Sequence, residues 1–284
     1  MRKVKKPVMS LVVRIVAAAA ITACAAGALL AQEATLTADS MNYNPNSRVI
    51  TVEGNVHITG QAGEIFGDAG RGSTVGDNFE MWGNVKGRFT HKDGSVVNIT
   101  CATASLKGRD KNSVVTASGD VRITRGTERL AADAVRWSTS VESYSATGNV
   151  LGSFTAYSID ADAVSRNLNA FEATNIRKFH ENSRKITMSA SRADGTIKNN
   201  EVTEMTAEGG VVATTPNKDG GMTRIAGDKA VYSLARGTLV VTGRANITQT
   251  GRALHSESLV YFLDSGRIDA VGAPSLTFET DRKK

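Results

Sequence analysis

Much of the chain alternates apolar with polar residues, which is the pattern of a β-strand with one buried face. In one stretch, apolar or small residues occupy every second position, at Ile50, Val52, Gly54, Val56 and Ile58. The same alternation returns from Val115 to Ile123 and from Leu239 to Ile247. Beyond the N-terminal segment, no stretch shows the 3.6-residue period of an amphipathic helix. The pattern therefore predicts an all-β protein.

A short glycine phrase, such as Gly54-Asn55-Val56, recurs along the chain. Its glycines are Gly54, Gly83, Gly119, Gly148, Gly209, Gly243 and Gly272, at intervals of 29, 36, 29, 61, 34 and 29 residues. The interval of 61 hides a degenerate copy around Ala173-Thr174-Asn175-Ile176. The chain is thus predicted to consist of eight units, each formed by a strand, a turn and a strand.

An acidic residue precedes most of these glycines by 15 positions. It is Asp39, Asp68, Asp133, Asp194, Asp228 or Glu257, with Ala104 in its place in the third unit. We expect the partner strand of each unit to begin at this residue. Asp160 and Asp162 fall at the same point of their own unit, so we interpret them as structural side chains at a turn or strand edge, not as a catalytic acid and base.

A glycine in the middle of a strand weakens that strand, so its recurrence requires a geometric reason. A bend or bulge at each glycine would let the strand leave one sheet and enter another. Such bends build a curved structure of two layers. With two long strands in each of eight units, we expect at least about 16 strands.

The N-terminal segment has the features of an export signal. Residues 1–14 are basic, and Ile15–Ala31 is an unbroken run of apolar or small residues,. Three fates remain open for residues 1–31: cleavage near Ala31, retention as a membrane anchor, or lipoprotein processing at Cys24. Residues 32–284 would then form the exported domain.

The charge balance argues against a nucleic-acid partner. The chain has 34 Lys and Arg against 28 Asp and Glu, and five of the basic residues lie within the first 31 positions. The remaining 29 basic residues are nearly balanced by the 28 acidic ones, so no domain-wide basic face is expected. An aromatic content of 5% also argues against a platform on which bases stack,.

No set of residues indicates catalysis, a metal or a cofactor. The histidines His57, His91, His180 and His255 are scattered, without the spacing of metal ligands,. The glycines Gly67, Gly70, Gly72 and Gly76 match no phosphate-binding fingerprint, and we interpret them as turn residues. Past the signal the chain has one cysteine, Cys101, which we expect to be a buried apolar side chain,.

The repeat resembles the OstA-like lipopolysaccharide-transport family, which includes LptA, LptC and the periplasmic part of LptD. The resemblance rests on an alanine or glycine before the aspartate, an aromatic residue four places later, and a closing Thr-Gly-Asn-Val strand. One copy is Ala132-Asp133 with Trp137, followed by Ala146-Thr147-Gly148-Asn149-Val150; another is Gly227-Asp228 with Tyr232, followed by Val241-Thr242-Gly243. The resemblance covers residues 36–278.

This resemblance implies an elongated, twisted β-jelly roll of about eight two-strand repeats after an N-terminal signal or anchor helix. A groove between its two layers would hold the acyl chains of lipopolysaccharide during transport through the periplasm, without catalysis. The alternation of inward residues suits such a groove, because each buried CH₂ group contributes about 0.8 kcal/mol. The candidate groove residues are Ile50, Val52, Val56, Ile58, Val115, Ala117, Val121, Ile123, Ala207, Val211, Leu239, Val241 and Ile247.

The family also implies partners. These are an inner-membrane transport complex that supplies the energy, an outer-membrane translocon, and other jelly-roll proteins. The strand-forming segments Leu36–Tyr43 and Leu276–Phe278 lie near the two ends of the repeat, so we expect stacking by edge-strand addition with such a protein or with a second copy.

Two alternatives stay open at the level of sequence. The eight units could form one continuous roll, which we favour, or two rolls that break near residues 169–185. An exported β-solenoid, acting as a scaffold or adhesin, would also show a regular repeat. The unequal unit lengths and the glycine within an apolar strand favour the jelly roll.

Overall fold

The structure is a computed structural model that describes residues 34–60, 63–73, 78–90, 94–108, 113–138, 143–198, 201–217 and 220–278. The predicted signal segment, residues 1–31, lies outside these ranges. A search of the described ranges for an apolar helix of membrane-spanning length finds none.

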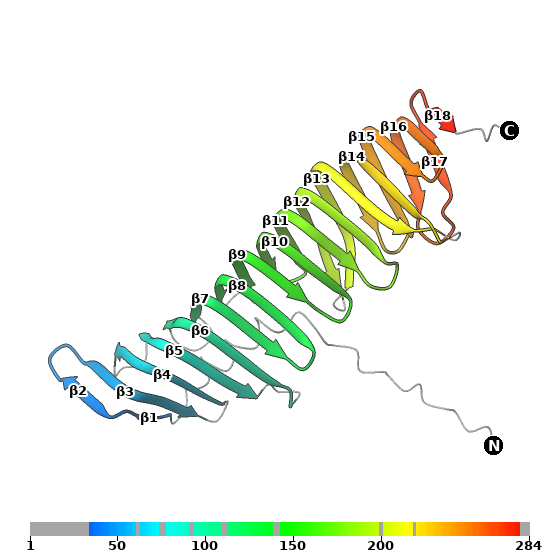
Figure 1. Cartoon of the computed structure of the whole chain (residues 1–284). Coiled ribbons are helices and arrows are strands. Elements are labelled where there is room, and N and C mark those ends of the chain that lie inside the picture. The colour runs from blue at the N-terminus through cyan, green and yellow to red at the C-terminus, as the bar shows by residue number, and fades with distance from the viewer. Residues whose placement is uncertain are drawn as a thin grey trace, which may run out of the picture.

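The described residues form a long antiparallel meander (Figure 1). Its strands are β1 Thr35–Thr37, β2 Ser40–Asn44, β3 Val49–Gly60, β4 Gly63–Ser73, β5 Asn78–Thr90, β6 Val96–Lys107, β7 Val114–Arg125, β8 Glu128–Ser138, β9 Ser143–Ser153, β10 Tyr157–Asn167, β11 Ala170–Glu181, β12 Ile186–Lys198, β13 Glu201–Pro216, β14 Met222–Ser233, β15 Thr238–Gln249, β16 Arg252–Phe262, β17 Ile268–Val271 and β18 Ser275–Phe278. The all-β architecture predicted from the alternation is confirmed, and so is the elongated shape that the family resemblance implies (Figure 1).

Each long strand pairs with the next one along the chain, from β3 through β16. At one end of the molecule β1 and β2 both pair with β3, and at the other end β17 and β18 both pair with β16. The ladder runs without a break through residues 169–185, where β11 pairs with both β10 and β12. The strands therefore stack along one long axis, with a short two-strand edge at each end (Figure 1).

The predicted bend at the repeated glycine is present. In the first unit the register of β3 and β4 shifts between Glu53 and Val56, and the two residues between them have positive φ, 74° at Gly54 and 48° at Asn55. The same pair of left-handed residues recurs at Gly83-Asn84, Gly119-Asp120, Gly148-Asn149, Gly209-Gly210, Gly243-Arg244 and Gly272-Ala273. Val52 and Val56, on either side of the bend, are both fully buried. At each bend, the strand therefore turns so that the apolar side chains of its two halves face each other.

The expected position of the acidic residue is wrong in one respect. Asp133 does not open its strand, because β8 begins at Glu128 and the residue lies mid-strand, opposite the bend of β9. The fixed offset also fails in two units. The residues beneath Gly119 and Gly209 are Ala102 and Ser191, and not the expected Ala104 and Asp194. Instead, Ala104 pairs with Ala117 and Asp194 pairs with Thr206, both as ordinary ladder positions.

The buried side chains form two groups along the axis. The first spans β3 to β9, from Val52 to Val150, and the second spans β10 to β16, from Tyr157 to Tyr261. Tyr144 and Val164 pack against both groups, so the two meet at β9 and β10.

Candidate functional site

The predicted groove residues lie in the interior of the roll. Eleven of the thirteen are buried, while Ile50 and Val115 are half-buried. Side chains before and after each bend point into the same space, so the two halves of each strand form two facing walls. The walls pack on each other closely around most of these residues.

Space between the walls is found where the two buried groups meet. A cavity of about 40 Å³ lies there, with an almost entirely apolar surface. It is lined by Leu130, Tyr144, Ala146, Val150, Phe154, Tyr157, Ile159, Val164, Phe171, Ala173, Ile176, Phe179, Ala193, Ile197, Val202 and Met205. None of the thirteen predicted groove residues belongs to this lining.

The cavity residues come largely from the units around the degenerate fifth copy, which the glycine phrase does not mark. A signal for them is nevertheless present in the sequence. The small Ala173 lies between Phe171 and Phe179 in the sequence of β11, and the small Ala146 of β9 and Ala193 of β12 also line the cavity. Small residues facing large rings leave room that matched apolar side chains would fill.

The two edges of the bent sheet approach each other beside the cavity. Tyr144 lies next to the connection that joins β8 to β9, on one side of the sheet. Tyr157 lies next to the connection that joins β9 to β10, on the opposite side. Burial raises the pKa of Tyr144 to about 12, which the nearby Arg166 guanidinium partly opposes. Burial also raises the pKa of Tyr157, and neighbouring Tyr144 adds to that rise. We call the opening between these two edges the mouth of the roll. Beside the cavity, the hydroxyl groups of these two tyrosines lie at the mouth, while their rings belong to the apolar interior.

Further along the roll, a cation spans the mouth between the edges. Arg184, in the turn between β11 and β12, donates a hydrogen bond to the carbonyl of Leu234 at 3.3 Å. It also forms a 3.3 Å ion pair with Asp264, which follows β16. The turns that hold Leu234 and Asp264 lie at the sheet edge opposite that of Arg184. These contacts hold the second half of the roll closed along its side.

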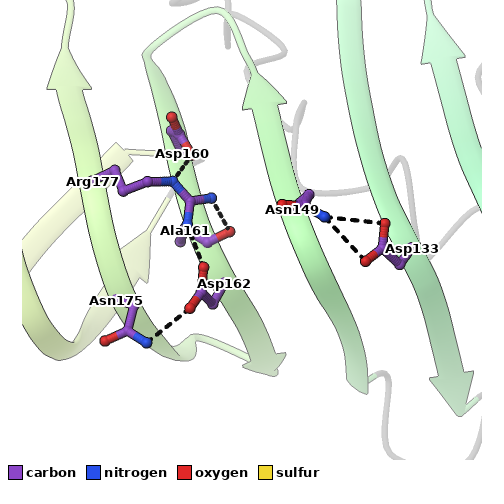
Figure 2. A network of polar contacts seen from close by, with 7 residues as sticks. All are labelled: Asp133, Asn149, Asp160, Ala161, Asp162, Asn175 and Arg177. Atoms are coloured by element: carbon purple, nitrogen blue, oxygen red, sulfur yellow. Dashed lines mark hydrogen bonds and ion pairs between the residues drawn. The ribbon is translucent and has the colours of Figure 1, made fainter.

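The acidic residues of the repeat stabilise the bends (Figure 2). Asp133 accepts hydrogen bonds from Asn149 Nδ2 at 3.2 and 3.5 Å. Asp162 accepts one from Asn175 at 2.8 Å, and Arg177 bonds Asp160, Asp162 and the carbonyl of Ala161.

The bonds from Asn175 and Arg177 hold the pKa of Asp162 below its usual range. Arg244 does the same for Asp228 in the seventh unit. These carboxylates are engaged in fixed pairs along the bends, which agrees with a structural role for Asp160 and Asp162.

The other candidate residues are also occupied by local contacts. His57 stacks on Phe66 at 4.0 Å and lies 3.3 Å from Glu64, and His180 bonds Thr187 at 2.9 Å. Cys101 is buried, and its burial raises its pKa to about 11. Among the described residues, no cluster of three or more His, Cys, Asp and Glu side chains could hold a metal ion. His91 lies outside the described ranges.

The interpretation of the glycine cluster as a turn is wrong for the residues that the structure describes. Gly67, Gly70 and Gly72 lie within strand β4, and side chains of β5 fill the space that a Cβ would occupy. Phe79 covers both Gly70 and Gly72. The fourth member, Gly76, lies outside the described ranges. These glycines allow close packing of an aromatic ring on the neighbouring strand.

At both ends of the roll, inward-facing apolar side chains lack a covering layer. Met41 and Tyr43 on β2 are each 51% exposed, although they pair with the inward Val52 and Ile50. On β18, Leu276 and Phe278 are 59% and 64% exposed. The interior is thus uncovered at each end of the long axis.

The chain is similar to one known family and to a solved structure. The family model described as "LptA/(LptD N-terminal domain) LPS transport protein" matches residues 99–267, more than half of the chain. The chain belongs to this family. The crystal structure of LptH, described as the LptA homologous periplasmic component of the lipopolysaccharide transport device from Pseudomonas aeruginosa, matches 54% of this chain and 95% of its own, at 13% identity and a TM-score of 0.32. A comparison with curated proteins gives no match.

Family membership confirms the resemblance read from the repeat. It assigns the chain a role related to lipopolysaccharide transport. The matched region of this family includes every residue that lines the cavity. The cavity therefore lies within the part of the chain that the family model matches.

Proposed function

We propose that this protein is a periplasmic carrier or bridge that shields the acyl chains of lipopolysaccharide between its two walls during transport from the inner to the outer membrane. Family membership supports the cargo, and the basic and apolar segment 1–31 supports export,. The observation that carries the proposal is the continuous apolar interior, which runs along the axis and is uncovered at both ends.

The energetics of acyl-chain burial suit this role. Each CH₂ group that leaves water contributes about 0.8 kcal/mol, so part of one chain is enough for firm binding. A cavity of about 40 Å³ holds only a small part of a chain, so the walls must separate for cargo to enter. The mouth contacts of Arg184 are polar and partly exposed, and their exchange for water is inexpensive compared with disruption of the ladder,.

Photo-cross-linking tests where the lipid lies. A photoreactive phenylalanine analogue at Phe171, which lines the cavity, is expected to form an adduct with lipopolysaccharide when the purified chain is irradiated with it. The matched control is the same analogue at Leu151, which is 53% exposed on the outer face of β9. An adduct at Leu151 without one at Phe171 would show that lipid binds outside the roll, and absence of both would overturn the proposal.

We further propose that the roll extends by strand addition at its ends, with other jelly-roll components or with a second copy. The outermost strands β2 and β18 expose apolar side chains of the inner face together with an unpaired backbone edge. A strand added there would pair this backbone and continue the apolar interior into the next molecule. Such stacking would place a shielded route between an inner-membrane complex and an outer-membrane translocon.

Engineered cysteines test this stacking. In a chain with Tyr43→Cys and Leu276→Cys, mild oxidation is expected to give a ladder of disulfide-linked oligomers on a non-reducing gel. Cys101 is buried with a raised pKa and is expected to stay unreactive,. A control chain with Tyr43→Cys and Leu151→Cys should give no such ladder. Monomers alone in both chains would contradict self-stacking, and long polymers that never carry lipid would favour a scaffold.

A further inference from the structure

Arg166 of β10 is a cation on an otherwise apolar stretch of the inner face. It pairs across the ladder with Tyr144 on β9 and Phe171 on β11, and both partners line the cavity. It also lies two positions after Val164, another lining residue, so all four side chains share one face of the sheet,. Arg166 therefore lies at the rim of the cavity, next to three of its lining residues.

The hydrogen-bonding capacity of this rim is not fully used. Arg166 Nε donates to the carbonyl of Leu168, and the guanidinium lies close enough to Tyr144 to oppose the rise in that residue's pKa. One of its terminal nitrogens, Nη1, is buried and has no hydrogen-bond partner within the part of the chain that the structure describes. The same holds for Trp137 Nε1 on β8, which pairs directly with Tyr144 across the ladder.

Leaving two buried donors without partners destabilises the fold, and the cost is larger for the charged guanidinium than for the indole. They lie on β8 and β10, and both residues pair across the ladder with Tyr144 on the strand between them. One acceptor group with several oxygens could satisfy both donors at once. A negatively charged acceptor would also complement the guanidinium, which favours bidentate contacts with phosphate.

We propose that Arg166, Tyr144 and Trp137 bind the phosphate group of an acylated lipid whose hydrocarbon chain enters the adjacent cavity. This rests on the proposed function, because it assumes that acyl chains lie between the walls. The arrangement places an apolar tail site and an anionic headgroup site side by side, as an anionic amphiphile requires. Lipopolysaccharide and phospholipids both present a phosphate next to acyl chains, so the experiment includes both.

The test compares binding of phosphorylated and phosphate-free lipids in detergent micelles. The probes are lipid A with its phosphates, lipid A stripped of them, phosphatidylglycerol, and diacylglycerol with matching acyl chains. Arg166→Gln is expected to weaken binding of lipid A about tenfold or more, as loss of a charged hydrogen bond does. It should leave binding of stripped lipid A unchanged, and Arg166→Lys should retain most of the affinity.

The matched control is Arg129→Gln. Arg129 is an exposed arginine on β8 whose ladder partners Thr124 and Ser153 lie on the outer face. It should bind every probe as the unchanged chain does. A folded Arg166→Gln chain that binds phosphorylated lipid A normally, or that loses both forms of lipid A equally, would overturn the headgroup site.

The two proposals fail in different ways. If the unchanged chain binds phosphatidylglycerol through Arg166 but no lipid A, the headgroup site stands and the lipopolysaccharide cargo is wrong. If it binds lipid A and Arg166→Gln has no effect, the cargo stands and the headgroup site is wrong. A chain that binds none of the four probes overturns both.

Discussion

Replacement of Gly148 by alanine is expected to lower the free energy of unfolding by about 3 kcal/mol. Two causes add. The residue has a φ of 72°, and an L-residue in this left-handed region costs about 1–2 kcal/mol,. A Cβ built on Gly148 would also lie 2.7 Å from the Cβ of Asp133, so Asp133 must move and weaken its bonds to Asn149, each of which contributes about 1 kcal/mol,.

Gly210 is the matched control, because it has nearly the same φ of 71° but nothing lies within 4 Å of the position of its Cβ. It is the second residue of its bend, a place that Ala273 fills with φ 45° in the last unit. Gly210→Ala should cost about 1 kcal/mol, from the strain of a left-handed backbone alone. Urea denaturation of both variants gives the comparison. Equal losses would show that backbone strain alone, and not the carboxylate above it, requires glycine at the bend.

The bends show how far the sequence determines this fold. Alternation at Val52 and Val56 correctly predicts which side chains face inward, because the bend inserts two left-handed residues and restores the same face. The position of Asp133 within its strand was predicted wrongly. The repeated aspartate does not mark the strand start, because the alternation at Leu130 and Ala132 continues ahead of it and the strand begins at Glu128.

The cavity and its rim were missed for a different reason. Whether inward side chains leave space between them depends on the distance between the two walls. The sequence of a single strand does not determine that distance. Arg166 illustrates this point. In the sequence it is one polar residue near a turn, and only its register with Tyr144 and Phe171 places it on the inner face beside a cavity. The degenerate fifth unit conceals these positions further.

A larger side chain at Ala173 is expected to weaken binding of lipopolysaccharide roughly tenfold while leaving the fold intact. Ala173 is buried on β11 and lines the cavity of about 40 Å³. In Ala173→Leu the three added carbon atoms would occupy that space, so a bound chain loses burial of at least two CH₂ groups, about 1.6 kcal/mol. Because the new side chain fills an existing cavity, stability should change by less than about 1.5 kcal/mol.

The control for this variant is Ala131→Leu, the same change on the outer face of β8, where Ala131 pairs with exposed Leu151. Titration of each purified variant with lipopolysaccharide, alongside urea denaturation, separates loss of binding from loss of folding. Reduced affinity in Ala173→Leu alone would place the acyl chains between the walls. A well-folded Ala173→Leu chain that binds lipopolysaccharide as tightly as Ala131→Leu would mean that the cargo does not use this cavity, because no hydrocarbon chain could share the filled space.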